Sequence, residues 1–250
     1  MTFQPRTPLH LATAVLVASC ASLKATETDE RIIAAARASY NFMTYLKDDK
    51  ITIVCKGGAV TLTGKVRDEF HRALAEETLA GLPGVQSVNN QLSLAGDSGI
   101  TPDTTLKARV ETALLFHRQL SAVKTQVAVE NGVVTLRGEA DSGTQKSLAT
   151  EYVKGLDGVV RVNNEMAVAG EHRKRKEIRK KIDDASITAQ IKLALLFNKA
   201  TSAVHTKVHT DNGFVTLAGT AKSQAERDLA TRIVKNVEGV RRVRNQMTVE

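Results

Sequence analysis

Aromatic residues are scarce in this sequence of 250 residues: they make up 4% of it, and tryptophan is absent. Hydrophobic cores must therefore be built mainly from Val, Leu, Ile and Ala. Cysteine occurs only twice, so the chain has no disulfide framework. Cys55 stands alone in a predicted strand and is interpreted as a small buried apolar residue. Cys20 belongs to a leader-like segment at the N-terminus.

Signatures of catalysis and of metal binding are also missing. The sequence contains no Gly-Lys-Ser/Thr phosphate-binding motif and no serine or cysteine nucleophile pattern. Of its six histidines, only His205 and His209 are close in sequence. Four residues of a strand span roughly 13 Å, which is too far for two imidazoles to share one metal ion. We therefore expect no catalytic residue, no metal site and no cofactor, in a protein that is not an enzyme.

What the sequence does have is a repeat. The pattern Gly-x-Val-Thr-Leu-x-Gly occurs three times, ending at Gly64, Gly138 and Gly219, which are 74 and 81 residues apart. A second pattern, Gly-Val-x-x-Val-x-Asn, begins at residues 84, 158 and 239 and keeps the same spacing. Two patterns in one register indicate a tandem array. The predicted divisions are a leader at 1–19, modules at 28–95, 101–168 and 184–250, and a linker at 169–183.

Each module is predicted to run α-β-β-α-β, an α+β fold. In the second copy a helix from about residue 106 to 117, capped by Asp103 or Thr104, precedes two β-branched runs around Asn131-Gly132. Such a dipeptide between two strands is a strong hairpin signal. A second helix and a third strand follow. The second helices are expected to be capped by Asp68, Ser142 and Ser223.

The two patterns together resemble the BON domain, and the resemblance covers nearly all of residues 28–249. It implies that each module packs two helices on a three-stranded sheet. It also implies a non-enzymatic protein of the bacterial envelope that binds phospholipid or associates with envelope components. The first copy departs from the others in its first helix, where Tyr40–Tyr45 replaces a Leu-Leu-Phe sequence.

The leader has the features of a secretory signal. Arg6 precedes an apolar run that is too short to cross ~30 Å of hydrocarbon and remain there. Val17-Ala18-Ser19-Cys20 resembles the bacterial lipobox, in which the cysteine is acylated and becomes the first residue. This resemblance implies a periplasmic protein anchored to the outer membrane through Cys20. Ordinary cleavage near Ala21 is the alternative.

Positive charge is concentrated toward the C-terminus. The net charge is +8, and residues 28–168 contribute almost none of it. The linker at 169–183 has three acidic residues and seven basic ones: Arg173, Lys174, Arg175, Lys176, Arg179, Lys180 and Lys181. Each cation near an anionic bilayer contributes about 1 kcal/mol. The linker therefore either binds an anionic membrane or serves as a solvated spacer. Nucleic acid is disfavoured because no aromatics are interleaved with the charge.

The first helices of copies two and three share an outward-facing leucine. At 100° per residue, Leu115 lies about 180° from Leu106, opposite the buried stripe, and Phe116 lies at its margin. Leu196 and Phe197 occupy the same positions in the third copy. These four residues are candidates for contact with lipid or with another module. The alternative is that they pack against a neighbouring loop.

The sequence thus predicts an exported, acylated protein of three BON-like modules that binds an anionic phospholipid membrane. Cys20 would supply one membrane signal, and the linker and third module would supply the other. The rival prediction is a protein-interaction or chaperone-like envelope factor that uses exposed sheet edges or helix faces. Oligomeric state is left open.

Overall fold

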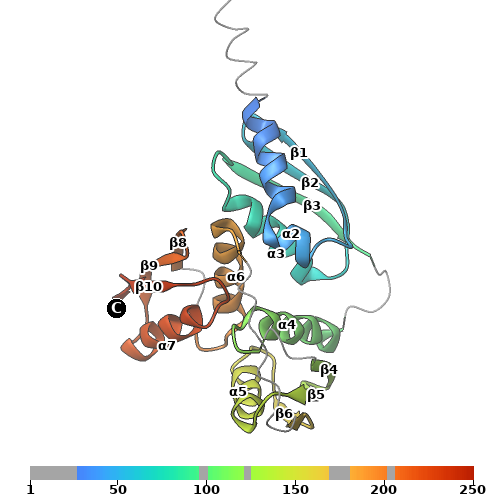
Figure 1. Cartoon of the computed structure of the whole chain (residues 1–250), viewed down its shortest axis with the longest axis vertical. Coiled ribbons are helices and arrows are strands. Elements are labelled where there is room, and N and C mark those ends of the chain that lie inside the picture. The colour runs from blue at the N-terminus through green and yellow to red at the C-terminus, as the bar shows by residue number, and fades with distance from the viewer. Residues whose placement is uncertain (1–26, 96–100, 121–124, 169–180, 202–205) are drawn as a thin grey trace, which may run out of the picture.

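The structure is a computed structural model, and it describes residues 27–95, 101–120, 125–168, 181–201 and 206–250. Within these ranges the chain forms three α+β modules in tandem, as the sequence predicts (Figure 1). The leader with Cys20 and the linker residues Arg173, Lys174, Arg175, Lys176, Arg179 and Lys180 lie outside the described residues.

Module 1 begins with a helix over residues 27–38 and continues with five further elements. These are α2 (Tyr40–Thr44), β1 (Lys50–Lys56), β2 (Ala59–Val66), α3 (Glu69–Ala80) and β3 (Ser87–Leu94). Module 2 consists of α4 (Pro102–Phe116), β4 (Thr125–Glu130), β5 (Val133–Ala140), α5 (Gly143–Lys154), β6 (Arg161–Asn164) and β7 (Ala167–Val168). Module 3 consists of α6 (Asp184–Phe197), β8 (Thr206–Asp211), β9 (Phe214–Ala221), α7 (Gln224–Lys235), β10 (Arg242–Asn245) and β11 (Thr248–Val249).

Each sheet has the second strand of its module in the middle. β2 pairs antiparallel with β1 and parallel with β3, and modules 2 and 3 repeat this order. The hairpin gives the antiparallel pair, and the second helix is the crossover that a parallel pair requires. In modules 2 and 3 the third strand is interrupted, so that β6 and β7, or β10 and β11, follow one another along the same edge. The helices cover one face of each sheet.

The closing glycine of the first pattern is required by backbone geometry. Gly64, Gly138 and Gly219 all have φ near +120°, a region that other residues avoid. A Cβ atom on Gly64 would lie 1.9 Å from the carbonyl oxygen of Lys50 on the neighbouring strand. The glycine therefore identifies a structural position in the sheet and carries no chemistry.

The asparagine that ends the second pattern ties the third strand to the second helix. The Asn164 side chain donates from Nδ2 to the Lys146 carbonyl and to Thr150 Oγ1, both at 2.8 Å. Its Oδ1 accepts from the Met166 amide at 3.0 Å. Asn90 and Asn245 occupy the same position in the other modules. In every module this asparagine therefore fixes the third strand against a backbone carbonyl of the second helix.

The caps of the second helices are as predicted, whereas the start of the first helix in module 2 is not. Asp68, Ser142 and Ser223 each accept from the third amide of their helix. However, α4 begins at Pro102 with Thr101 as its cap, because proline with its fixed φ is well suited to the first helical position. Asp103 therefore does not cap this helix. It binds the hairpin turn instead.

In all three modules one aspartate holds the hairpin turn. Asp103 accepts from the amides of Asn131 and Gly132 at 2.6 and 2.9 Å. Asp29 and Asp184 do the same in modules 1 and 3. In module 1, amide donation from Gly58, with further hydrogen bonds from Cys55 and Gly57, lowers the pKa of Asp29. Cys55 itself is buried, as predicted.

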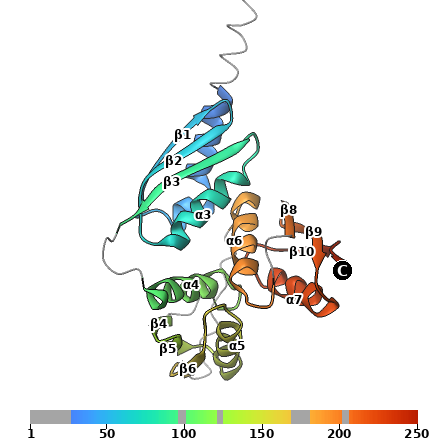
Figure 2. The ribbon, with the colours of Figure 1, turned by 180° about the vertical axis from the view of Figure 1, so that it is seen from behind.

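The helix α6 differs from the other helices because it is buried on nearly all sides. Ten of its residues are buried, including Ala189, Gln190 and Ile191. One side packs on its own sheet, and the other contacts α3 of module 1 and α4 of module 2. A helix that is buried all round belongs to the interior of a larger assembly. Figures 1 and 2 show α6 where the three modules meet.

Candidate functional site

The predicted membrane-contact leucines lie on the surface. Leu115 is 41% exposed and Leu196 is 53% exposed, as their positions opposite the buried stripes of α4 and α6 predict. Of the seven predicted linker cations, Lys181 is described, and it too is exposed.

Phe116 is not available to a membrane in this structure. The side chain is 1% exposed and lies in the hydrophobic core that module 1 builds. Phe197 is half-buried, packs against the cores of modules 1 and 2, and lies under the Arg109 guanidinium at 5.2 Å. Of the contacts that the sequence left open for Phe116, the structure shows the one with another module, because a position at the margin of one helix can be covered by a neighbouring module.

The scarce aromatic residues of the chain gather at this junction. Phe70 of module 1 lies 5.6 Å from Phe116 of module 2 and 5.9 Å from Phe197 of module 3, between ring centroids. Tyr45 packs edge-on against Phe116 at 5.4 Å. Such contacts add about 0.5–1.5 kcal/mol per pair beyond area burial. These aromatics therefore join modules to one another, a role that the helical period of one module could not reveal.

Modules 2 and 3 dock on one another reciprocally. The amide of Glu238 donates to the Phe116 carbonyl at 3.0 Å, and the amide of Asp157 donates to the Phe197 carbonyl at 2.8 Å. The two bonds are equivalent, because Phe197 and Glu238 follow Phe116 and Asp157 by the 81 residues that relate the two modules. The bonds from Arg118 to Asn236 and from Lys199 to Gly155 are related in the same way. The contact is thus a pseudo-twofold one, with the same patch used on both sides.

A buried histidine lies within this reciprocal contact. His117 pairs with Val237, packs on Tyr152 at 4.6 Å, and its Nε2 has no hydrogen-bond partner among the described residues. Burial, with a smaller contribution from Arg118, lowers its pKa to about 4. The equivalent residue in module 3 is Asn198. Both side chains accept from the amide two residues later, His117 through Nδ1 and Asn198 through Oδ1.

Module 1 docks on α6 through a polar side-chain network. Asn41 is fully buried and donates to Thr78 Oγ1 at 2.8 Å, while its Oδ1 accepts from Gln190 Nε2 at 2.8 Å. Its backbone amide donates to Ser186 Oγ at 3.1 Å. Lys192 of α6 also pairs with Glu77 of α3 at 2.6 Å. Asn41 occupies the module position that Leu115 and Leu196 occupy in copies two and three, so this position is a docking point in module 1.

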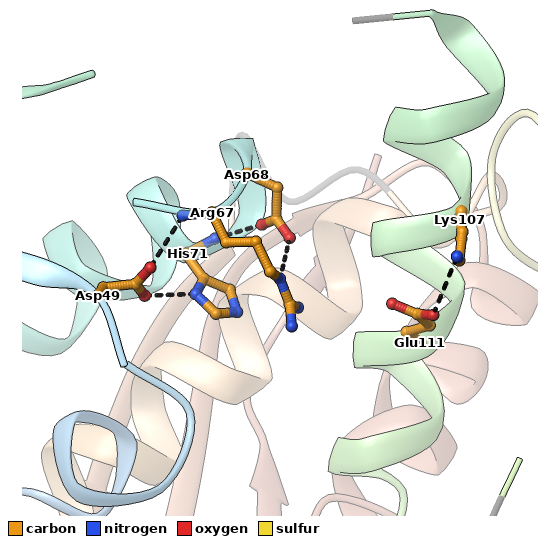
Figure 3. A network of polar contacts seen from close by, with 6 residues as sticks. All are labelled: Asp49, Arg67, Asp68, His71, Lys107 and Glu111. Atoms are coloured by element: carbon orange, nitrogen blue, oxygen red, sulfur yellow. Dashed lines mark hydrogen bonds and ion pairs between the residues drawn. The ribbon is translucent and has the colours of Figure 1, made fainter. Parts of the chain in front are cut away.

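A second polar network lies beside the module 1–module 2 boundary (Figure 3). The His71 Nδ1 lies 2.5 Å from Asp49 Oδ2, and the other oxygen of Asp49 accepts from the Arg67 amide at 2.8 Å. Asp68 caps α3 through the His71 amide and pairs with the Arg67 side chain at 3.0 Å. Figure 3 shows the Arg67 side chain extending toward α4, which carries the Lys107–Glu111 pair. Asp49 and Asp68 therefore both serve to fix the loop before α3.

A solvent-open hollow of about 420 Å³ lies along β4. Its charged lining consists of Lys107, Glu111 and Arg137, and Arg137 is paired with Glu165 at 2.8 Å. Within the described residues no three His, Cys, Asp or Glu side chains come together as a metal ion would require. Nothing in this hollow assembles a nucleophile with a base. It is a surface groove beside an edge strand.

No helix in the described part of the chain is long and apolar enough to span a bilayer.

Comparison with known proteins gives two informative relatives. The chain is 32% identical over 205 residues to osmotically-inducible protein Y of Escherichia coli, covering 82% of this chain and 98% of that protein. It is 31% identical over 142 residues to the outer membrane lipoprotein DolP of Haemophilus influenzae, covering 56% and 71% respectively.

Likeness to solved structures is remote. The C-terminal domain of CdsD, a structural protein of the type III secretion system of Chlamydia trachomatis, has 14% identity and a TM-score of 0.24, covering 80% of this chain and 89% of that one. That score carries no argument. The sequence family does: the BON domain matches residues 28–96, 102–170 and 183–250. The chain is therefore a member of the BON domain family, with three copies of the domain.

Proposed function

We propose that this protein is a non-enzymatic component of the bacterial envelope that binds anionic phospholipid and supports envelope integrity under stress. The observation that carries the proposal is the segregation of charge. The surplus of positive charge lies in residues 169–250, whereas residues 28–168 are close to neutral. A one-sided basic surface is attracted to an anionic bilayer within a Debye length of ~8–10 Å.

Two further features support a membrane role. Leu115 and Leu196 are exposed on helices where nothing described covers them. The relatives include one named as an outer membrane lipoprotein, which agrees with acylation at Cys20. One acyl chain gives only marginal membrane binding, so a second, electrostatic signal would make the attachment stable. Arg173, Lys174, Arg175 and Lys176 would supply part of that signal.

The test is co-sedimentation of residues 20–250, produced without acylation, with vesicles of phosphatidylglycerol and phosphatidylcholine. We expect binding to the anionic vesicles that weakens steeply with salt. Changing Arg173, Lys174, Arg175 and Lys176 to Gln should reduce the affinity by at least tenfold and by up to about a thousandfold, since each cation contributes about 1 kcal/mol at most. Equal binding to neutral vesicles would contradict the electrostatic model.

A matched control removes the same charge from module 1. Lys47, Lys50, Lys56 and Lys65 are all exposed, and changing them to Gln should affect binding much less. Leu115→Ser and Leu196→Ser should reduce binding if the helix side of these modules meets the lipid, and should leave thermal stability nearly unchanged in either case. If the two charge variants lose affinity equally, net charge alone is responsible and the linker has no special part.

The alternative is a protein-interaction or chaperone-like envelope factor. The hollow beside β4 favours it, because among the described strands β4 pairs with β5 alone and leaves its other edge open. An extended segment of another protein can add to such an edge. Binding of this kind would not require anionic lipid, and it would resist salt concentrations that release the protein from vesicles.

A further inference from the structure

The open face of the module 3 sheet combines an exposed aromatic ring with unpaired cations. In the register of this sheet, Phe214 on β9 lies between Arg242 on β10 and Asp211 on β8. The next row along the same face is Arg244, Thr216 and His209. Side chains of paired strand residues point to the same face. Lys207, paired with Ala218, completes a third row.

Phe214 is the one aromatic side chain with a largely exposed surface among the described residues, at 49%. The other described Phe and Tyr residues are buried or half-buried. Exposing a phenylalanine ring to water is unfavourable, and the fold of module 3 does not require an aromatic residue at this position. The equivalent residues, Ala59 and Val133, show that the fold accepts a smaller side chain there.

The cations around Phe214 lack acidic partners within the described part of the chain. Lys207, Arg242 and Arg244 are all exposed, and none of them takes part in a described ion pair. Among the residues of β8, β9 and β10, Asp211 is the single carboxylate, and it accepts from the side chain of Asn212. Three cations against this one carboxylate leave these strands with a net positive charge next to an apolar ring.

Module 2 supplies the comparison that makes this face distinctive. At the positions of Phe214, Arg242, Arg244, His209 and Lys207 it has Val133, Arg161, Asn163, Ala128 and Gln126. Glu130 shares a row with Arg161 just as Asp211 shares one with Arg242. The further cation of the module 2 face, Arg137, is paired with Glu165, whereas Arg244 and Lys207 have no described ion pair. The same fold thus carries a neutral face in module 2 and a basic one in module 3.

We propose that the open face of the module 3 sheet is the surface that lies on the anionic bilayer, with Phe214 inserted at the interface and Arg242, Arg244 and Lys207 among the headgroups. This inference rests on the proposed function. Aromatic rings favour the membrane–water interface, and basic side chains beside them are attracted by anionic lipid. In Figures 1 and 2 the sheet of β8, β9 and β10 lies on the outer side of α6 and α7, away from modules 1 and 2.

The absence of tryptophan provides a direct test. Phe214→Trp places the one tryptophan of the protein on this face, and Val133→Trp places it at the same position in module 2. Each variant, as residues 20–250, is mixed with phosphatidylglycerol vesicles, with and without a lipid-borne quencher. We expect a blue shift and quenching for Phe214→Trp and neither for Val133→Trp.

A matched pair of double variants measures how much Phe214 and Arg242 contribute to the free energy of membrane binding. Phe214→Ser with Arg242→Gln should weaken binding to anionic vesicles roughly thirtyfold, which corresponds to about 2 kcal/mol for the two groups together. Val133→Ser with Arg161→Gln should change it less than about twofold. Thermal unfolding of both doubles should stay close to the parent, which separates loss of binding from loss of fold.

The outcomes separate this inference from the function on which it rests. If the parent protein fails to sediment with anionic vesicles, the proposed function is wrong. If the parent sediments but the Phe214→Trp emission stays unshifted, or both doubles bind as the parent does, another surface meets the lipid and this inference is overturned. Tighter binding to single-stranded DNA than to vesicles, lost in the module 3 double, would assign the face to nucleic acid instead.

Discussion

Module 3 makes two contacts with the rest of the protein, and they are built differently. Its contact with module 2 is organised by backbone hydrogen bonds arranged reciprocally around His117 and Asn198, with Phe197 packed beside them under Arg109. Its contact with module 1 consists of side chains: the network of Asn41, Thr78 and Gln190, and the aromatic cluster around Phe70. A backbone contact needs only the right shape, whereas a side-chain network needs particular residues.

The difference explains why one contact is symmetric and the other is not. Modules 2 and 3 present the same backbone edges because they share a fold, so the same patch can serve on both sides. Module 1 has Asn41 where the others have Leu115 and Leu196, and its partner position Ser186 corresponds to Thr105 and Arg31 in modules 2 and 1. Divergence between copies therefore allows module 1 a different docking mode.

The largest expected effect comes from removing the Phe116 ring. Phe116→Ala should destabilise the protein by about 3–5 kcal/mol, because a fully buried ring in the aromatic cluster is lost and a cavity remains. Urea unfolding measures the loss, and Leu115→Ala, at the exposed neighbour, is the control. Hydrogen exchange should show the amides of Glu238 and Asp157 still protected and the amide of Asn41 less so. Equal loss of protection at both contacts would mean that they are one cooperative unit.

Asn41→Ala should weaken the module 1 contact by roughly 2–4 kcal/mol. The substitution leaves Gln190 Nε2 buried without its acceptor, in a network where Gln190 Oε1 already has no partner. Leu115→Ala removes a side chain at the same module position, and it should cost less than about 1 kcal/mol because that position is exposed. Similar losses for the two variants would show that the polar network contributes little. Calorimetry of both proteins provides the measurement.

The reciprocal contact should weaken in acid. The pKa of His117 falls from 6.5 to about 4 on folding, so the unfolded chain binds a proton between these values and the folded chain does not. The free energy of unfolding therefore has its full value above about pH 6.5. It decreases as the pH falls toward 4, by up to ~3 kcal/mol. His117→Asn reproduces Asn198 and should remove this dependence. Urea midpoints at pH 7, 5.5 and 4.5 compare the two proteins, and the same slope for both would exclude His117 as the cause.

Much of the fold could be predicted because local signals repeat. The hairpin turns, the caps at Asp68, Ser142 and Ser223 and the glycines that end the second strands are properties of short segments. Three copies in one register removed most ambiguity. The start of α4 was misplaced because Thr101-Pro102 and Asp103 are both good start signals. The role of Asp103 in holding the turn depends on an atom 28 residues away, which no local pattern shows.

The candidate surface residues also differ in whether a local sequence pattern is enough to place them. Leu115 and Leu196 were correctly placed outside because the period of a helix decides which side chains face its own sheet. The same period places Phe116 at the margin of its helix but does not say what covers it, because the covering residues belong to another module. Nothing in the sequence distinguishes Phe214, because an aromatic residue after Asn-Gly is typical of a strand. Its exposure follows from the register of β8, β9 and β10.

By itself the sequence determined the number of modules, the order of their elements, the residues of each turn and the uneven distribution of charge, because these depend on residues near one another in the chain. The tertiary structure decided which of the three similar helices is buried on all sides, how a module position becomes a polar anchor at Asn41 and an exposed leucine elsewhere, and which sheet face carries the unpaired cations. These depend on packing between modules and on strand register, where contacts join residues far apart in sequence.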